Sequence, residues 1–210
     1  GLLLVRGTHT HTLEVHTHFC LCTVMWGVAQ RSVLQLGNPL LRSKALNVCL
    51  RTELQAVAQA APAMFHIMET QGGCGLAATQ LGLAKRFFVV QWDGNSCGDT
   101  TQREVIINPR IVTSDRSSLE KGFEGCLSVP GLAALVTRPS SIEVEYHSVD
   151  GTLIHRHLKG FAARVFQHEL DHLNGIVYLD RVKSNKDIIM ESQQDVFVAA
   201  LPLAEAKKLV

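Results

Sequence analysis

Residues 160–173 constrain the fold most strongly, because their pattern indicates a helix that carries two histidines four residues apart. In His168-Glu-Leu-Asp-His172 the two imidazoles lie one above the other on a single helical face. Both rings can therefore reach one metal ion, and Glu169 would lie beside a water bound to that ion. Gly175 follows closely and stops the helix. Since the motif has only three fixed positions, a surface helix with solvated charges is the alternative interpretation.

A hairpin is the second clear element. Residues 141–147 alternate strictly between an apolar face and an acidic face, as a strand with one buried side does. Asp150-Gly151 follows at once and is a strong turn signal. We therefore expect residues 152–157 to return as the partner strand.

The other elements are less sharply marked. Residues 53–70 repeat apolar side chains at helical spacing, and we expect Pro62 to kink that helix or split it. Apolar runs at residues 86–92 and 104–108 have strand length, and a third helical stretch could run through 187–200. Strands clustered between helices at each end indicate an α+β fold with largely antiparallel sheets.

Charge and cysteine content exclude several classes of protein. The net charge is +1, so no strong electrostatic attraction to nucleic acid or to an anionic membrane is built in, and the sequence carries no direct nucleic-acid motif. The six cysteines are scattered without the spacing of a disulfide framework. That favours a reducing compartment and leaves a thiol free for metal or catalysis. No uncharged apolar run is long enough to span a membrane, and we expect no membrane association.

Two histidines make an incomplete metal site, so a third ligand is required. One candidate is Cys126, in a tight segment before the hairpin. The other is Glu191, which follows His172 by 19 residues, a spacing that would suit a thermolysin-like protease. By base rates alone Cys126 would be a plain buried cysteine. These residues by themselves leave the choice open.

Three segments, read together, narrow the choice. They occur in the order Gly73-Cys-Gly-Leu-Ala-Ala-Thr-Gln80, Glu124-Gly-Cys-Leu-Ser128 and Gln167-His-Glu-Leu-Asp-His-Leu-Asn-Gly175. Together they resemble the three signature motifs of the peptide deformylase family, and the resemblance extends roughly over residues 33–180. It implies antiparallel β-sheets packed around a central helix that carries His168 and His172.

The same resemblance implies the chemistry. Cys126 would be the third ligand, a water would take the fourth position, and N-formylmethionyl ends of newly made peptides would lose formate. The implied physiological metal is Fe²⁺, while one thiolate and two imidazoles also suit Zn²⁺, Ni²⁺ or Co²⁺. Because the family acts on nascent chains, we expect transient contact with the ribosome, in the bacterial cytoplasm or alternatively in a mitochondrion or plastid.

Formamide hydrolysis needs a nucleophile at neutral pH, stabilisation of an oxyanion and a proton for the departing nitrogen. We expect Glu169 to take the proton of the water and deliver it to the amine. The side-chain amide of Gln80 can donate to the oxyanion, and by resemblance the backbone N–H of Leu127 is its partner. Glu124 and Arg138 are expected, partly by resemblance, to pair beneath the site and fix the ligand loop.

Gly73, Cys74 and Gly75 form the expected substrate-binding loop, since glycines let a backbone approach a ligand closely. Cys74 replaces the aliphatic residue usual in the family, which would change the wall of the pocket for the first side chain. Ala133 falls where many relatives carry a basic residue, which bears on recognition of the peptide backbone. The spacing of Gly73, Gly75 and Ala78 imitates a dinucleotide-binding fingerprint, but the helix precedes it and the strand follows, so we reject that reading.

These expectations divide the chain into three parts. Residues 1–32 are assigned to a flexible, histidine-containing extension, 33–182 to the catalytic metal-hydrolase domain and 183–210 to a C-terminal helical segment. An endopeptidase that uses Glu191 as third ligand is the alternative enzyme. A structural Cys/His/His module is the non-enzymatic alternative, although structural sites are normally closed by four protein ligands.

Overall fold

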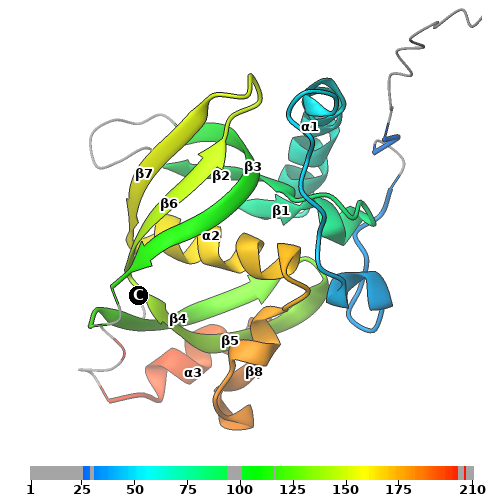
Figure 1. Ribbon diagram of the computed structural model, residues 1–210. Helices are drawn as coiled ribbons and strands as arrows, with labels where there is room; N and C mark the ends of the chain where they lie inside the picture. The colour runs from blue at the N-terminus through cyan, green and yellow to red at the C-terminus, as the bar shows by residue number, and fades with distance from the viewer. Residues whose placement is uncertain (1–25, 29–30, 94–100, 116, 203–205, 207–210) are drawn as a thin grey trace, which may run out of the picture.

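Two antiparallel sheets lie on opposite sides of helix α2 in the computed structural model (Figure 1). The structure describes residues 26–28, 31–93, 101–115, 117–202 and 206. The larger sheet has the strand order β1-β2-β3-β6-β7 and the smaller has the order β4-β5-β8. In chain order the helices and strands are α1 (Leu54–Thr70), β1 (Gly75–Ala77), β2 (Phe87–Asp93), β3 (Thr101–Ser114), β4 (Leu119–Cys126), β5 (Val129–Pro139), β6 (Ser141–His147), β7 (Leu153–Lys159), α2 (Gly160–Leu173), β8 (Ile188–Met190) and α3 (Gln194–Ala199). This arrangement confirms the predicted α+β class.

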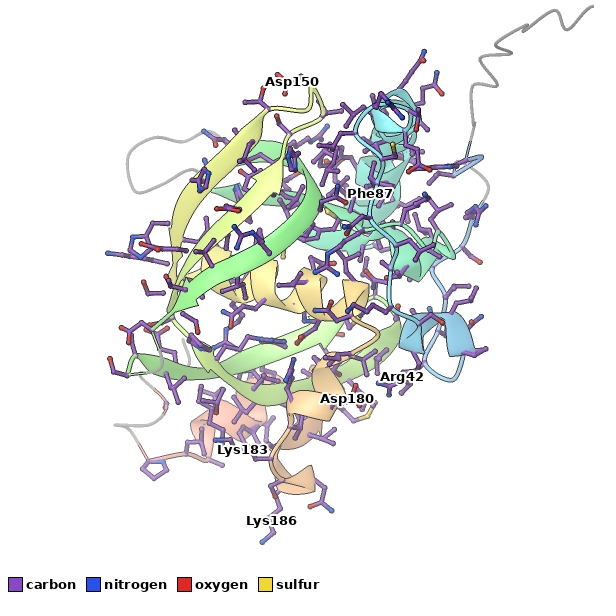
Figure 2. All side chains as sticks on the ribbon, in the orientation of Figure 1. Arg42, Phe87, Asp150, Asp180, Lys183 and Lys186 are labelled. Atoms are coloured by element: carbon purple, nitrogen blue, oxygen red, sulfur yellow. The ribbon has the colours of Figure 1, made fainter. Side chains whose placement is uncertain are left out.

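The β6–β7 hairpin forms as the sequence pattern predicts. The two strands pair antiparallel along their length, and the apolar face of β6 is buried. Asp150 lies at the tip (Figure 2), where its side chain accepts a hydrogen bond of 3.0 Å from the backbone N–H of Thr152. Gly151 has a φ of +86°, which glycine adopts readily. The returning strand ends at Lys159 rather than at residue 157.

Helix α1 contains Pro62 without ending there. It runs continuously over Leu54–Thr70, which excludes a split at Pro62, while the alternative of a kink stays a prediction. Pro62 and Ala58 are both exposed. Pro62 has no backbone N–H to donate to the Ala58 carbonyl, and water can form that hydrogen bond instead because both residues are exposed.

The segment that follows the two histidines of α2 differs from the prediction. Instead of one helix through residues 187–200, Ile188–Met190 forms strand β8 and only Gln194–Ala199 is α-helical. β8 adds to the edge of β5, with Ile189 opposite Ala133. Two adjacent isoleucines favour a strand wherever a sheet edge is free to pair, and this preference overrides the helical reading.

Helix α2 is held in the centre by its broad buried face. Phe166 packs edge-on against Phe88 of β2, with ring centroids 5.4 Å apart. Gly175 ends the turn that follows the helix, with a φ of +75°, and a Cβ there would be 2.4 Å from the carbonyl oxygen of Arg42. Only glycine fits this approach, and it fixes the end of α2 next to the histidines.

The described part of the N-terminal segment packs against the core between α1 and the larger sheet. The Trp26 ring stacks on Phe87 with centroids 5.5 Å apart, and Val28 is buried. Residues 1–25, which include the histidine-rich run, lie outside the described residues, so the predicted extension stays a prediction. Among the described helices, none combines the length and apolar character that crossing a membrane would require.

Candidate metal centre

Three candidate ligands from two separate elements meet at one point. Cys126 is the last residue of β4, just before the two-residue turn into β5, whereas His168 and His172 lie on α2. One ligand atom from each lies within 4.8 Å of the other two. Cys126 Sγ is 3.2 Å from His172 Nε2, and the two imidazole centroids are 5.0 Å apart. Among the described residues this is the one group of three or more such side chains that could hold a metal ion.

The donor set fits a divalent metal of intermediate softness. A thiol and two imidazoles suit Fe²⁺, Zn²⁺, Co²⁺ or Ni²⁺ better than Mg²⁺ or Ca²⁺. His168 Nδ1 faces Glu124 Oε2 at 3.0 Å, which leaves Nε2 of that ring as the nitrogen for a metal. Glu191 lines the same pocket, yet its carboxylate is not part of the three-ligand group. Within the described part of the chain this group has three protein ligands and no fourth, which is the pattern of a catalytic site.

The two imidazoles differ in their electrostatic surroundings. Burial lowers the pKa of His172 well below its usual value, so this ring is held neutral, the form that binds metal. Burial also opposes a charge on His168, but hydrogen bonds with Cys126 and Glu124 raise the pKa of that ring well above its usual value. The Glu124 carboxylate at Nδ1 stabilises positive charge on the His168 ring. It would do the same if Nε2 donated its lone pair to a metal cation.

Glu169 lies beside the ligands in an almost closed space. Burial raises the pKa of its carboxyl to about 7, although the charge of His168 acts in the opposite direction. Its Oε2 has no hydrogen-bond partner among the described residues, although buried oxygens normally have one. Gly75 makes room for this side chain, because a Cβ at position 75 would be 2.3 Å from Glu169 Oε1. The carboxylate is thus available to a small molecule in the pocket.

Gln80 is fixed by hydrogen bonds from both ends of its amide. Its Oε1 accepts from the backbone N–H of Ala77 at 2.8 Å, and its Nε2 donates to Ser128 Oγ at 3.1 Å. The same Nε2 is 3.6 Å from Cys126 Sγ. One amide hydrogen therefore has a good acceptor, while the other meets only sulfur, a weak acceptor.

A cavity of about 390 Å³ opens in front of these groups. Gly73, Cys74, Gly75 and Leu127 are among the residues that line it. A Cβ at Gly73 would be 3.0 Å from Leu127 Cδ1, so these two lining residues lie close together. Burial raises the pKa of the Cys74 thiol, and the neighbouring carboxylate of Glu169 acts in the same direction. Cys74 is accordingly an uncharged, compact part of the wall.

The predicted pair of Glu124 and Arg138 forms a salt bridge whose two side chains are buried. Arg138 donates from Nε to Glu124 Oε1 at 2.6 Å and from Nη2 to Oε2 at 2.8 Å. Burial alone would raise the pKa of Glu124, but hydrogen bonds with Arg138 and His168 hold it far below its usual value. Glu124 thus stays ionised behind His168.

Sequence reasoning missed three residues of this network. Asp171 accepts from Arg138 Nη1 at 2.8 Å, and Arg164 Nη1 donates to Glu124 Oε1 at 2.8 Å. Arg181 makes two further bonds to Asp171. Asp171 could have been noticed within the histidine motif, because a carboxylate on the buried face of a helix requires a cationic partner.

A half-buried thiol and two imidazoles around one point, with a carboxylate beside them and a cavity in front, are the features of a mononuclear metallohydrolase. Comparison with known proteins gives the family. A family model described as polypeptide deformylase matches residues 30–187. Peptide deformylase 2 of Nostoc sp. is 38% identical over 169 residues, or 79% of this chain and 93% of that protein.

Solved structures agree with this match. The crystal structure of peptide deformylase from Thermotoga maritima has a TM-score of 0.66 at 36% identity and covers 73% of this chain and 98% of its own. A peptide deformylase from Synechococcus elongatus, crystallised in complex with actinonin, has a TM-score of 0.66 at 33% identity and covers 78% and 84%. The chain belongs to the peptide deformylase family, metalloenzymes that remove the N-formyl group from newly made peptides.

Proposed function

We propose that Cys126, His168 and His172 hold one divalent cation and that the chain uses it to hydrolyse the formamide bond of formyl-methionyl peptides. The observation that carries this proposal is the meeting of those three ligand atoms at a pocket that also holds the Glu169 carboxylate, whose Oε2 has no hydrogen-bond partner within the described part of the chain. Family membership supplies the substrate class.

The reaction adds water to the formyl carbon and breaks the carbon–nitrogen bond, which gives formate and a free amine. When bound, the cation supplies Lewis acidity that makes water a nucleophile at neutral pH and polarises the formyl oxygen. Glu169 accepts the proton that the water loses and delivers it to the departing nitrogen. Gly75 leaves room for the Glu169 side chain, which lines the pocket.

Gln80 and Leu127 stabilise the negative charge that develops on the formyl oxygen. Ser128 holds one hydrogen of the Gln80 amide, so the hydrogen that meets only Cys126 Sγ is the one that the substrate oxygen can attract. The backbone N–H of Leu127 is the second donor. Both donors are fixed before substrate arrives, which is why they lower the barrier effectively.

The loop of Gly73, Cys74 and Gly75 binds the peptide through its backbone and forms a wall for the methionine side chain. The protonated Cys74 thiol provides an apolar, slightly smaller surface than an aliphatic residue would. Ala133 is buried opposite Ile189 of β8, so this position offers no basic group to the peptide. Backbone hydrogen bonds from the loop of Gly73, Cys74 and Gly75 must therefore provide most of the binding to the peptide.

Glu124 and Arg138 keep His168 in the orientation that presents Nε2 to the cation. Fe²⁺ is the physiological metal in this proposal, and Zn²⁺, Ni²⁺ or Co²⁺ can occupy the same ligands. The enzyme acts on formyl-methionine at the ends of nascent chains, in transient contact with the ribosome. That places it in a bacterial cytoplasm, or alternatively in a mitochondrion or plastid.

The test is formate release from a formyl-Met tripeptide by protein purified without oxygen, with metal analysis of the same sample. We expect the rate of formate release to scale with the amount of bound metal. The matching acetyl-Met tripeptide should not be hydrolysed at a comparable rate. Thiolate-bound Fe²⁺ should lose activity in air and keep it anaerobically. Full metal occupancy without formate release would overturn the proposal and favour a structural metal site.

A further inference from the structure

We infer that Arg181 is a positioning residue for the metal ligand His168, acting through Asp171, Arg138 and Glu124. Arg181 ends the 3₁₀ helix Tyr178–Arg181, outside the ligand loop and outside α2. The inference rests on the proposed metal site and extends the support of its ligand His168 to the 3₁₀ helix that follows α2.

The outer half of this connection is a two-bond ion pair. Arg181 donates from Nη2 to Asp171 Oδ1 at 2.6 Å and from Nε to Oδ2 at 3.0 Å. Arg138 Nη1 donates to the same Oδ2 at 2.8 Å. Asp171 thus joins two arginines, one from the 3₁₀ helix and one from β5.

The inner half leads from Arg138 to the metal ligand. Arg138 holds both oxygens of Glu124, at 2.6 Å and 2.8 Å, and Glu124 Oε2 faces His168 Nδ1 at 3.0 Å. Every link is a hydrogen bond between groups of opposite charge or to an ionised carboxylate, the strong kind. The chain from Arg181 to His168 has no gap.

Charge balance explains why Arg181 matters. The side chains of Glu124, Arg138 and Asp171 are 4%, 6% and 8% exposed, so this is a nearly dry set with one arginine between two carboxylates. Arg164 provides a second cation to Glu124, and Arg181 provides one to Asp171. Without Arg181, Arg138 would be the one arginine that bonds to Asp171 among the described residues, and its guanidinium would be free to shift toward Asp171. The two hydrogen bonds from Arg138 that hold Glu124 in place would then weaken.

A second contact links the same 3₁₀ helix to His168. The Tyr178 ring stacks on the His168 imidazole, with centroids 6.0 Å apart and an interplanar angle of 26°. The helix therefore bears on both the face of the ring and, through Arg181, the hydrogen bond behind it. An experiment must separate these two routes.

The chain offers a matched control for Arg181. Arg42 forms an ion pair with Asp180, the residue next to Arg181 in the same 3₁₀ helix. Figure 2 shows the side chains of Arg42 and Asp180 beside each other. The side chains of Arg42 and Arg181 are 47% and 45% exposed. Their partners differ, because Asp180 is 40% exposed and Asp171 only 8%. Only Arg181 is connected to the buried chain.

The experiment compares Arg181→Gln with Arg42→Gln in zinc-loaded protein. Zinc loss to a chelator should be roughly tenfold faster in Arg181→Gln and within twofold of wild type in Arg42→Gln. The NMR signal of the His168 Nδ1 proton, read with and without zinc, should shift or broaden only in Arg181→Gln. Arg181→Lys, which restores charge but not the two-bond geometry, should recover part of the loss.

A double-mutant cycle with Glu124→Gln separates the two routes, because a residue acting through Glu124 adds no further loss once Glu124 is changed. Equal zinc loss in Arg181→Gln and Arg42→Gln, or full additivity with Glu124→Gln, would overturn the inference. If Arg181→Gln does not fold, Arg181→Lys decides, with an expected loss about threefold faster than wild type. Wild-type protein that binds no zinc would instead overturn the proposed metal site.

Discussion

Replacing Gly75 by alanine should displace the carboxylate of Glu169. A Cβ at position 75 would be 2.3 Å from Glu169 Oε1 and 2.8 Å from its Cγ. Ordinary contacts of a Cβ begin near 3.4 Å. Because α2 is held between two sheets, the Glu169 side chain has to give way by about 1 Å rather than the backbone.

The size of the effect follows from that displacement. A misplacement of about 1 Å at a catalytic group costs roughly 100-fold in rate, or about 2.7 kcal/mol of barrier. We therefore expect kcat/KM of Gly75→Ala for a formyl-Met tripeptide to fall roughly 100-fold. Metal content should equal that of wild type, because the nearest atoms to the new methyl group all belong to Glu169.

The assay is anaerobic formate release at measured metal content, with Gly125→Ala as the matched control. Gly125 lines the same pocket, but its Cβ would be 3.8 Å from the nearest such atom, the Leu132 carbonyl oxygen. That variant should stay within about fivefold of wild type, since no atom has to move. A loss below tenfold in Gly75→Ala, or a loss shared by Gly125→Ala, would refute the reasoning.

Three further predictions concern the ligands and the proton and oxyanion groups. Glu169→Ala should keep the metal and lose roughly 100- to 10,000-fold in turnover, and near-normal formate release would remove its assigned role. Gln80→Ala should lower kcat by roughly 100- to 1,000-fold, and a change within tenfold would contradict its part in oxyanion stabilisation. Cys126→Ala should empty the site in metal analysis, whereas Glu191→Ala should retain the metal, and the opposite pattern would restore the endopeptidase reading.

Local patterns in the sequence were sufficient for the elements that position the site. The strict alternation before Asp150-Gly151 predicts the hairpin, because side chains of a strand alternate between core and solvent. The spacing of His168 and His172 predicts a shared helical face for the same geometric reason. Both signals depend only on residues close together in the chain.

Elements that depend on distant partners were not predictable in this way. Ile188–Met190 becomes a strand because β5 offers a free edge, and Arg181 finds Asp171 because the chain turns back after α2. Arg138 and Asp171 are 33 residues apart, and no local pattern relates them. Cys126 stood out only together with two other segments, since a single cysteine has no periodicity to mark it.

The most direct test of the central claim is an X-ray absorption spectrum of metal-loaded protein prepared without oxygen. We predict one sulfur at about 2.3 Å and two imidazole nitrogens at about 2.0–2.1 Å, completed by oxygen from solvent. In Cys126→Ala that sulfur contribution should be absent. A wild-type spectrum without sulfur, or one in which four protein ligands close the coordination sphere, would contradict the account.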